Sequence, residues 1–158
     1  MTPQTTDLIA ELTAQEQRLV LPRFTPEDAW ELGRRITESA RAAGAGVMID
    51  VRRGDFVVFR ASLSGATVDQ QTWVARKAAV VRRFECSSAL FAARMDQAGV
   101  DPVAMGWLDH GYAVTGGSFP VRVEGAGVVA AVTASGLTSQ EDHDLVVNGV
   151  AELLADLS

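Results

Sequence analysis

The sequence predicts an α+β fold in which an antiparallel sheet of about five strands is flanked by helices. The candidate strands come in pairs that a short turn can join into hairpins, and they do not alternate singly with helices as in βαβ units. The 158 residues are enough for one hydrophobic core but short for two. No linker rich in proline, glycine or serine divides the chain, so we expect residues 1–158 to form a single domain.

The helices are predicted from apolar residues that recur every three or four positions. Their expected bounds are 7–18, 26–43, about 69–97, and a last helix that opens near 139. Thr25 before Pro26 is a typical helix start, and Thr138 stands three residues before Glu141 as a capping box. We expect Trp30 on the buried stripe of the second helix.

The strands are predicted from short runs of alternating or continuous apolar residues bounded by turn residues. They are an edge strand or extended linker at 19–21, a hairpin of 47–51 with 56–59, and a hairpin of 119–123 with 128–133. Gly54 and Asp55 can form the turn of the first hairpin, and residues 124–127 can form that of the second.

Composition and charge exclude several classes of protein. The fractions of hydrophobic (47%) and charged (22%) residues are those of an ordinary soluble domain. No apolar run approaches the roughly 18 residues of a membrane helix, and the polar start lacks a signal-peptide core, so we expect a cytoplasmic protein without a membrane partner. The net charge of −6 argues against a nucleic-acid partner. The single cysteine, Cys86, excludes an internal disulfide, and a buried inert thiol is expected there.

The densest cluster of chemically special residues is the segment 110–120. Gly116 and Gly117 can adopt positive φ or allow a close backbone approach, and their amides could form an anion-binding nest beside Ser118 and Phe119. The alternative is that the two glycines only turn the chain into the next strand. No Gly-Lys-Ser/Thr follows, so the segment is not a phosphate loop.

Two further candidate sites lie on helices. Asp142 and His143 fall in the first turn of the last helix, where a histidine tends to stay neutral and can accept a proton; the alternative is a partly exposed polar residue. On the long helix, Lys77 lies in an apolar stripe beside Arg76. It either extends to the rim or faces a buried carboxylate or ligand. The alternative for this basic group is a solvated or inter-subunit face.

The sequence predicts no metal site of its own. With only two histidines, neither a His-x-x-x-His nor a His-Glu-x-x-His pattern occurs. A haem needs only one or two axial ligands, and those that could serve in principle are His110, His143, Met48, Met95, Met105, Tyr112 or Cys86.

Several motifs occur together in one order and resemble a known family. They are Ala29-Trp30-Glu31-Leu32-Gly33, Ile49-Asp50-Val51-Arg52, Trp73 with Arg76-Lys77, Arg83-Phe84, Ser87-Ser88, Gly116 to Val123, and Ser135-Gly136-Leu137 with Glu141-Asp142-His143. Over about residues 15 to 155 the chain resembles the uncharacterised bacterial and fungal family grouped with the haem-degrading domain (GlcG/HbpS-like) proteins. The resemblance implies a profilin-like, GlcG-like fold, homo-oligomers and haem binding. It also implies that Thr115 stands where the family usually has a histidine.

Three functions follow as hypotheses. The first, which the resemblance favours, is a protein that binds haem or a small anionic ligand between the 116–119 loop, Asp142-His143 and the basic Arg76-Lys77 face, whose cations would pair with propionates. The second is an enzyme acting on a small carbonyl or carboxylate metabolite, with His143 as general base, Asp142 as its partner and the Gly116–Gly117 amides as an oxyanion cradle. The third is a non-catalytic, homo-oligomeric interaction module.

Overall fold

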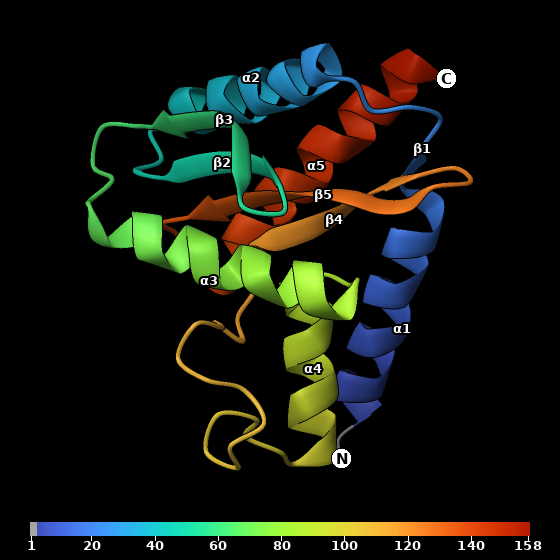
Figure 1. Ribbon diagram of the computed structural model, residues 1–158, viewed down its shortest axis with the longest axis vertical. Coiled ribbons are helices and arrows are strands. Elements are labelled where there is room, and N and C mark those ends of the chain that lie inside the picture. Colours follow the sequence, from blue (N-terminus) through green and yellow to red (C-terminus); the bar gives the residue numbers. More distant parts are fainter. Residues whose placement is uncertain (1–2) are drawn as a thin grey trace.

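The computed structural model describes residues 3–158 and contains five helices and five strands within that range (Figure 1). The elements are α1 (Pro3–Arg18), β1 (Val20–Leu21), α2 (Pro26–Ala42), β2 (Met48–Arg53), β3 (Phe56–Ser62), α3 (Asp69–Phe84), α4 (Ser88–Ala98), β4 (Ser118–Val123), β5 (Gly127–Ser135) and α5 (Ser139–Leu157). The strands form one sheet in the order β1-β4-β5-β2-β3. The predicted α+β class and both predicted hairpins are therefore confirmed.

The sheet is mostly antiparallel, with one exception at its edge. The pairs β2–β3, β2–β5 and β4–β5 are antiparallel. The two-residue strand β1 runs parallel to β4, with Val20 opposite Arg122. A strand this short adds few hydrogen bonds, and its main effect is to attach α1 to the edge of the sheet.

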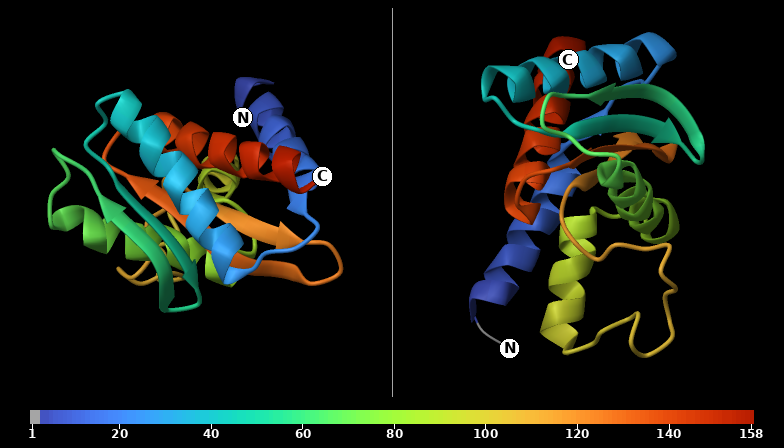
Figure 2. Two further views of the ribbon diagram at one scale, coloured as in Figure 1. Left: turned by 90° about the horizontal axis from the view of Figure 1, so that it is seen from above. Right: turned by 90° about the vertical axis from the view of Figure 1, so that its left-hand side faces the viewer.

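The two faces of the sheet differ because side chains alternate along each strand. Ile49 and Val51 of β2 point into the main core, which α2 and α5 cover. The neighbouring Asp50 and Arg52 fall on the opposite face, which α3 covers (Figures 1 and 2). The sheet is thus apolar toward one helical layer and partly charged toward the other.

The expectation for Trp30 is wrong. Its side chain is 56% exposed, and its ring lies edge-on to that of Phe59. The buried face of α2 is instead formed by Ala29, Leu32, Gly33, Ile36 and Ala40. A Cβ at Gly33 would lie 2.2 Å from the Phe59 ring, so Phe59 occupies the space beside the helix and leaves Trp30 outside it.

The single long helix predicted for 69–97 is also wrong, because the chain forms two helices there. Glu85 ends α3 in the left-handed conformation (φ 53°), and it is the only non-glycine residue with positive φ within 3–158. Ser87 then caps α4 by accepting a hydrogen bond from the Leu90 amide at 3.1 Å. Hydrophobic spacing continues across this break, which is why periodicity alone does not reveal it.

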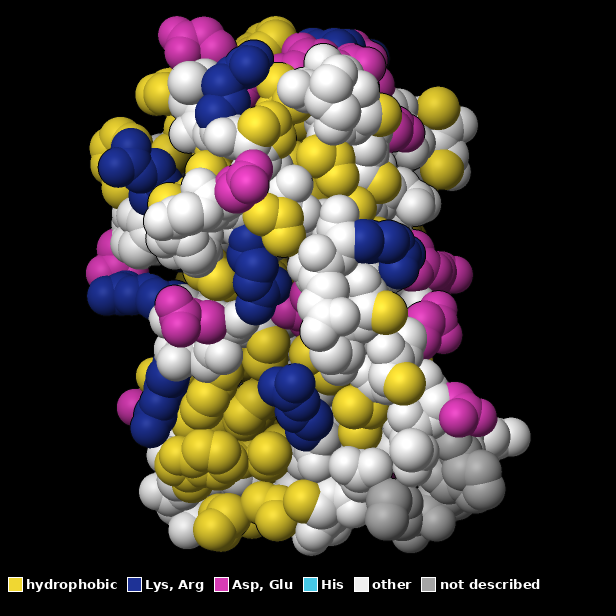
Figure 3. All heavy atoms as spheres, turned by 90° about the vertical axis from the view of Figure 1, so that its right-hand side faces the viewer, with side chains coloured by type: hydrophobic (Ala, Val, Ile, Leu, Met, Phe, Trp, Pro, Cys, Tyr) yellow, Lys and Arg dark blue, Asp and Glu magenta, His cyan; other side chains and the backbone are white. Residues whose placement is uncertain are grey.

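The change of direction places α4 beside α1, away from the sheet, where a second core forms (Figure 2). The rings of Phe84 and Phe91 stack at 4.2 Å. Cys86 is buried in this cluster, and burial raises the pKa of its thiol to about 11, which fits an inert thiol. Met105 (64%) and Trp107 (43%), in the loop after α4, remain exposed. Hydrophobic side chains gather over this lower part of the molecule in Figure 3.

No helix among the described residues is long and apolar enough to cross a membrane. The same part of the chain contains no group of three or more His, Cys, Asp or Glu side chains that could hold a metal ion.

Candidate functional site

Asp142 is held in the first turn of α5 by the turn that connects it to β5. The predicted capping box is present: Thr138 accepts from the Glu141 amide, and Glu141 accepts from the Thr138 amide. The Asp142 carboxylate accepts the backbone N–H of Leu137 at 3.1 Å. The side chain is only 2% exposed, so its charge needs a buried partner.

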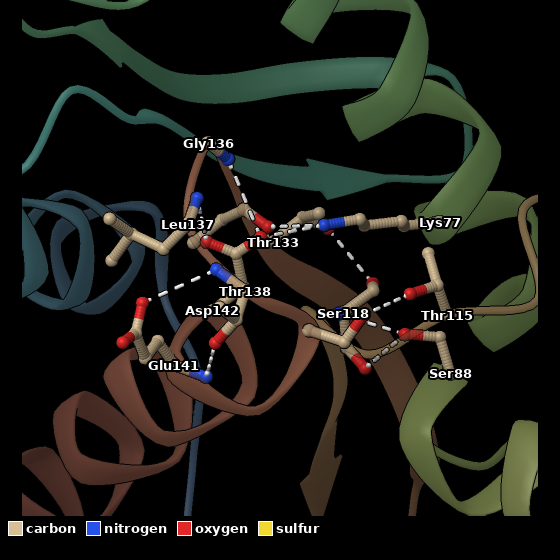
Figure 4. A network of polar contacts seen from close by, with 12 residues as sticks. Lys77, Ser88, Thr115, Ser118, Thr133, Gly136, Leu137, Thr138, Glu141 and Asp142 are labelled. Atoms are coloured by element: carbon tan, nitrogen blue, oxygen red, sulfur yellow. Dashed lines mark hydrogen bonds and ion pairs between the residues drawn. The ribbon is translucent and has the colours of Figure 1, made fainter.

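That partner is Lys77, which reaches Asp142 from α3 (Figure 4). Its Nζ atom donates to Oδ2 of Asp142 at 2.9 Å and to the carbonyl oxygen of Ala134 at 3.1 Å. The side chain is 4% exposed. Of the alternatives that the sequence left open for Lys77, the structure shows the buried carboxylate. The ion pair joins α3, β5 and α5.

The two glycines before β4 allow close approach of other atoms. A Cβ at Gly117 would lie 2.7 Å from Nζ of Lys77 and 2.6 Å from the carbonyl oxygen of Ala134, and its φ is +135°. A Cβ at Gly116 would lie 2.6 Å from the carbonyl oxygen of Ser139. Space for the lysine and for the start of α5 therefore requires glycine at both positions.

A set of buried hydroxyl groups links the start of α4 to β4 and β5. Ser118 Oγ and Thr133 Oγ1 lie 2.8 Å apart on paired strands, and Ser88 Oγ accepts the Ser118 amide at 3.0 Å. Phe119, the next residue of β4, is fully buried in the main core. Ser118 and Phe119 therefore lie inside the fold.

His143, the next residue of α5, points in a different direction from Asp142, toward α1, and is 1% exposed. Its Nε2 atom lies 2.7 Å from Oε1 of Gln15 on α1, and its ring is edge-on to that of Phe119. With Oε1 as acceptor, Nε2 carries the proton and Nδ1 keeps a lone pair. Nδ1 has no hydrogen-bond partner among the described residues. Burial lowers the pKa of the imidazole, so the ring is neutral at pH 7.

A cavity of about 290 Å³ lies against His143, between α1, α4 and α5, and we call it the His143 pocket. Its lining residues are Leu8, Leu12, Ala89, Ala92, Ala93, Asp96, Val114, Thr115, Gly116, Ser139, Gln140 and His143. Three alanines from α4 leave the space open, and Asp96 is its one acidic side chain. The walls are thus mainly apolar, with a neutral imidazole among them.

A second cavity, of about 260 Å³, lies against Lys77 and Asp142, and its lining is mostly polar. Thr115 and Ser139 line both cavities, and their hydroxyl groups are hydrogen-bonded to each other. The pair therefore forms a ridge between an apolar pocket and a polar one. Thr115, at the position where the resemblance implies a histidine, is part of this ridge.

The residues that the sequence singled out are only partly brought together. The structure brings Lys77 and Asp142 together in a buried ion pair, with Gly117 beside it. His143 is hydrogen-bonded to Gln15 and not to Asp142. Arg76 lines a different cavity. Gln15, absent from the predicted set, lies on a helix recognised only by its amphipathic pattern. No local signal in the sequence links it to a histidine 128 positions away.

Comparisons with known proteins identify the family. The family model described as "Haem degrading protein HbpS-like" matches residues 24–151. The chain belongs to this HbpS-like family. A UPF0303 protein from Streptomyces avermitilis is 46% identical over 147 residues, which cover 92% of this chain and 90% of that protein. A UPF0303 protein from Streptomyces coelicolor is 44% identical over 156 residues, covering 98% and 99%. The family resemblance seen in the sequence is therefore confirmed.

Solved structures show the same HbpS-like architecture. The crystal structure of Ybr137w superposes with a TM-score of 0.86 at 27% identity, covering 94% of this chain and 88% of that one. HbpS itself gives a TM-score of 0.67 at 23% identity, covering 84% and 90%. A PduOC:heme complex gives 0.66 at 15% identity, covering 81% and 93%, and at that identity the likeness concerns the fold alone.

The family name raises the question of whether haem fits the His143 pocket. A haem requires an axial donor that faces the pocket and basic groups for its two propionates. Nδ1 of His143 has almost no exposed surface, and Nε2 is hydrogen-bonded to Gln15, so neither nitrogen is available as an axial donor. None of the described lining side chains is basic, and Asp96 would repel a propionate. The pocket volume of about 290 Å³ is also just below the usual range of about 300–1,000 Å³ for ligand pockets. The residues of this pocket do not fit haem.

The buried ion pair makes the HbpS-like fold sensitive to loss of either charge. Replacing Lys77 by Met should lower the free energy of unfolding by about 3–5 kcal/mol, because Asp142 would keep a buried charge without its partner. Arg82→Met is the matched control on the same helix: its ion pair with Asp55, at 2.7 Å, is largely exposed and should contribute within about 1 kcal/mol. Urea denaturation measures both. Equal losses in the two variants would contradict the role assigned to burial.

Burial of neutral His143 should also make stability depend on pH. Its pKa is 6.5 in the unfolded chain and lower in the folded one, so the unfolded state binds more protons as the pH falls. The contribution is present in full above pH 6.5 and is lost as the pH falls toward the pKa of the folded state. His143→Gln should flatten the dependence of the urea midpoint between about pH 7.5 and 5. The exposed His110, replaced in the same way, serves as control and should leave it unchanged.

Proposed function

We propose that this HbpS-like protein binds a small neutral or cationic molecule in the His143 pocket. The observation that carries the proposal is a mainly apolar cavity of about 290 Å³ against the neutral His143, in which Asp96 is the one acidic residue of the described walls. Mainly apolar cavities with a few polar groups are typical binding sites for small molecules.

The remaining walls define the chemistry of the ligand. Leu8, Leu12 and the alanines of α4 favour an apolar body, and the Thr115–Ser139 ridge offers hydroxyl groups at the rim. Asp96 disfavours an anion and attracts a cation. The imidazole of His143 is neutral and adds no charge of its own to the pocket.

Binding is favoured over catalysis by His143. A general base must come within hydrogen-bond reach of the proton that it abstracts, and Nδ1 is shielded from solvent. The predicted partner, Asp142, is already engaged with Lys77. PduOC is known in complex with haem, yet the lack of basic lining groups here favours a ligand without the negative charges of the haem propionates.

Three probes that share a benzene ring test the proposal: phenol, benzylamine and benzoate. Phenol and benzylamine should bind, since each has an apolar ring and no negative charge, whereas benzoate should not, because Asp96 repels it. Saturation-transfer NMR on the full chain measures all three. Ala92→Phe, on a half-buried position of the wall, should fill the pocket and abolish binding.

The matched control is Ala98→Phe at the exposed end of the same helix, which should leave probe binding unchanged. Hemin should give no Soret shift that depends on His143. Benzoate binding as well as phenol, or phenol binding that survives Ala92→Phe, would contradict the proposal.

We also propose that the protein self-associates through the apolar surface formed by α4 and the loop after it. Met105 is 64% exposed and Trp107 43%, and the ring of Trp107 contacts those of Phe84 and Phe91. Hydrophobic surface concentrated in this way is typical of protein interfaces. The family resemblance, which implies homo-oligomers, favours a second copy of the chain as the partner.

Met105→Asp should disrupt this association, because it places a charge in the apolar surface without touching a buried residue. Light scattering after gel filtration should give a multiple of 16.8 kDa for the unmodified chain and a lower mass for the variant. Val68→Asp, at an exposed apolar position before α3, is the control and should keep the original mass. A monomeric unmodified chain would refute the proposal.

A further inference from the structure

The face of the sheet beneath α3 carries an arginine cluster that the proposed function does not use. Asp50 on β2 is fully buried, and it lies opposite Arg60 in the pairing of β2 with β3. Arg52 lies two residues further along β2, on the same face. The three side chains therefore project together toward α3.

Asp50 holds both guanidinium groups in fixed positions. Arg52 donates from Nε to Oδ1 at 2.6 Å and from Nη2 to Oδ2 at 3.0 Å. Arg60 donates from Nε and Nη2 to Oδ2 at 3.0 and 2.9 Å. Each arginine thus uses two of its three nitrogens on the same carboxylate, and Nη1 of neither donates to it.

These arginines line a cavity of about 540 Å³ between β2, β3 and α3, which we call the arginine cavity. Its lining residues are Arg52, Asp55, Arg60, Gln71, Thr72, Ala75, Arg76, Ala79 and Gly111. Arg76 enters from α3, and no carboxylate among the described residues lies within ion-pair distance of it. The cavity shares no lining residue with the His143 pocket.

The local charge is opposite to that of the whole chain. Arg52, Arg60 and Arg76 line the cavity, and Asp50, which pairs with the first two, offsets one of the three charges and leaves an excess of two positive charges. The one acidic residue of the described lining, Asp55, is already paired with Arg82 at 2.7 Å. The chain as a whole carries −6. A concentrated positive site in an acidic protein is expected to attract anions selectively.

We propose that the arginine cavity binds a small dianion, either a phosphate group or a dicarboxylate. Guanidinium groups present planar, paired N–H donors that match the oxygen atoms of phosphates and carboxylates. Asp50 fixes two of the three groups in advance, so less conformational entropy is lost when the anion binds. The two free positive charges match the charge of a dianion.

Isothermal titration calorimetry on the full chain at low ionic strength tests the proposal with inorganic phosphate, succinate and acetate. Phosphate, succinate or both should bind, and acetate, a monoanion, should bind at least about tenfold more weakly. The stronger of the two dianions identifies the ligand chemistry. Arg76→Gln should weaken dianion binding about tenfold or more, and Arg76→Lys should recover only part of it, because lysine lacks the planar fork.

Arg41→Gln removes the same charge from an exposed position of α2, on the other side of the sheet, and should change affinity by no more than about twofold. Ala92→Phe in the His143 pocket should have no effect. Arg60→Gln provides a second variant that leaves the pair of Asp50 with Arg52 intact. Absence of phosphate and succinate binding would overturn the proposal, and so would equal weakening by Arg41→Gln and Arg76→Gln.

Discussion

The buried ion pair between Lys77 and Asp142 links the two helical layers that cover the opposite faces of the sheet. Lys77 comes from the helix beneath the sheet, and Asp142 from the helix that follows β5 and covers the other face. Two charges removed from water cost several kcal/mol each, and only close pairing with further hydrogen bonds offsets that cost. The further hydrogen bonds come from the carbonyl oxygen of Ala134 and the amide of Leu137. The absence of a side chain at Gly117 leaves the space that Lys77 needs.

The two candidate cavities arise from the same layered arrangement but have opposite chemistry. The break at Glu85 turns α4 toward α1, and the small side chains of α4 leave a mainly apolar space against His143. The polar face of β2 and β3 lies beneath α3, where Asp50 organises two arginines. An acidic protein thus combines an apolar pocket with one acidic side chain and a separate cavity with excess positive charge.

Local signals in the sequence predicted the hairpins, the caps at Thr25 and Thr138, and the fold class, because turn and capping chemistry acts over a few residues. For the environment of Lys77 the sequence left two alternatives, solvent at the rim or a buried partner, since a lysine in an apolar stripe needs one of them. The pairing of His143 with Gln15 and the meeting of Arg76 with β2 and β3 depend on tertiary contacts, which no short motif encodes. Periodicity missed the left-handed Glu85 for the same reason: the apolar stripe continues across it.

The first helix has a consequence for how the imidazole can change its charge. It provides the partner of Nε2 and one wall of the His143 pocket, yet it joins the sheet through a strand of only two residues. Its other ties include Glu16, which accepts the Ser87 amide and pairs with Arg122. Local detachment of this helix would expose Nε2 of the ring and the cavity at the same time. Occupancy of the pocket and proton uptake by His143 are therefore thermodynamically linked: a ligand that keeps the helix in place also keeps the imidazole neutral.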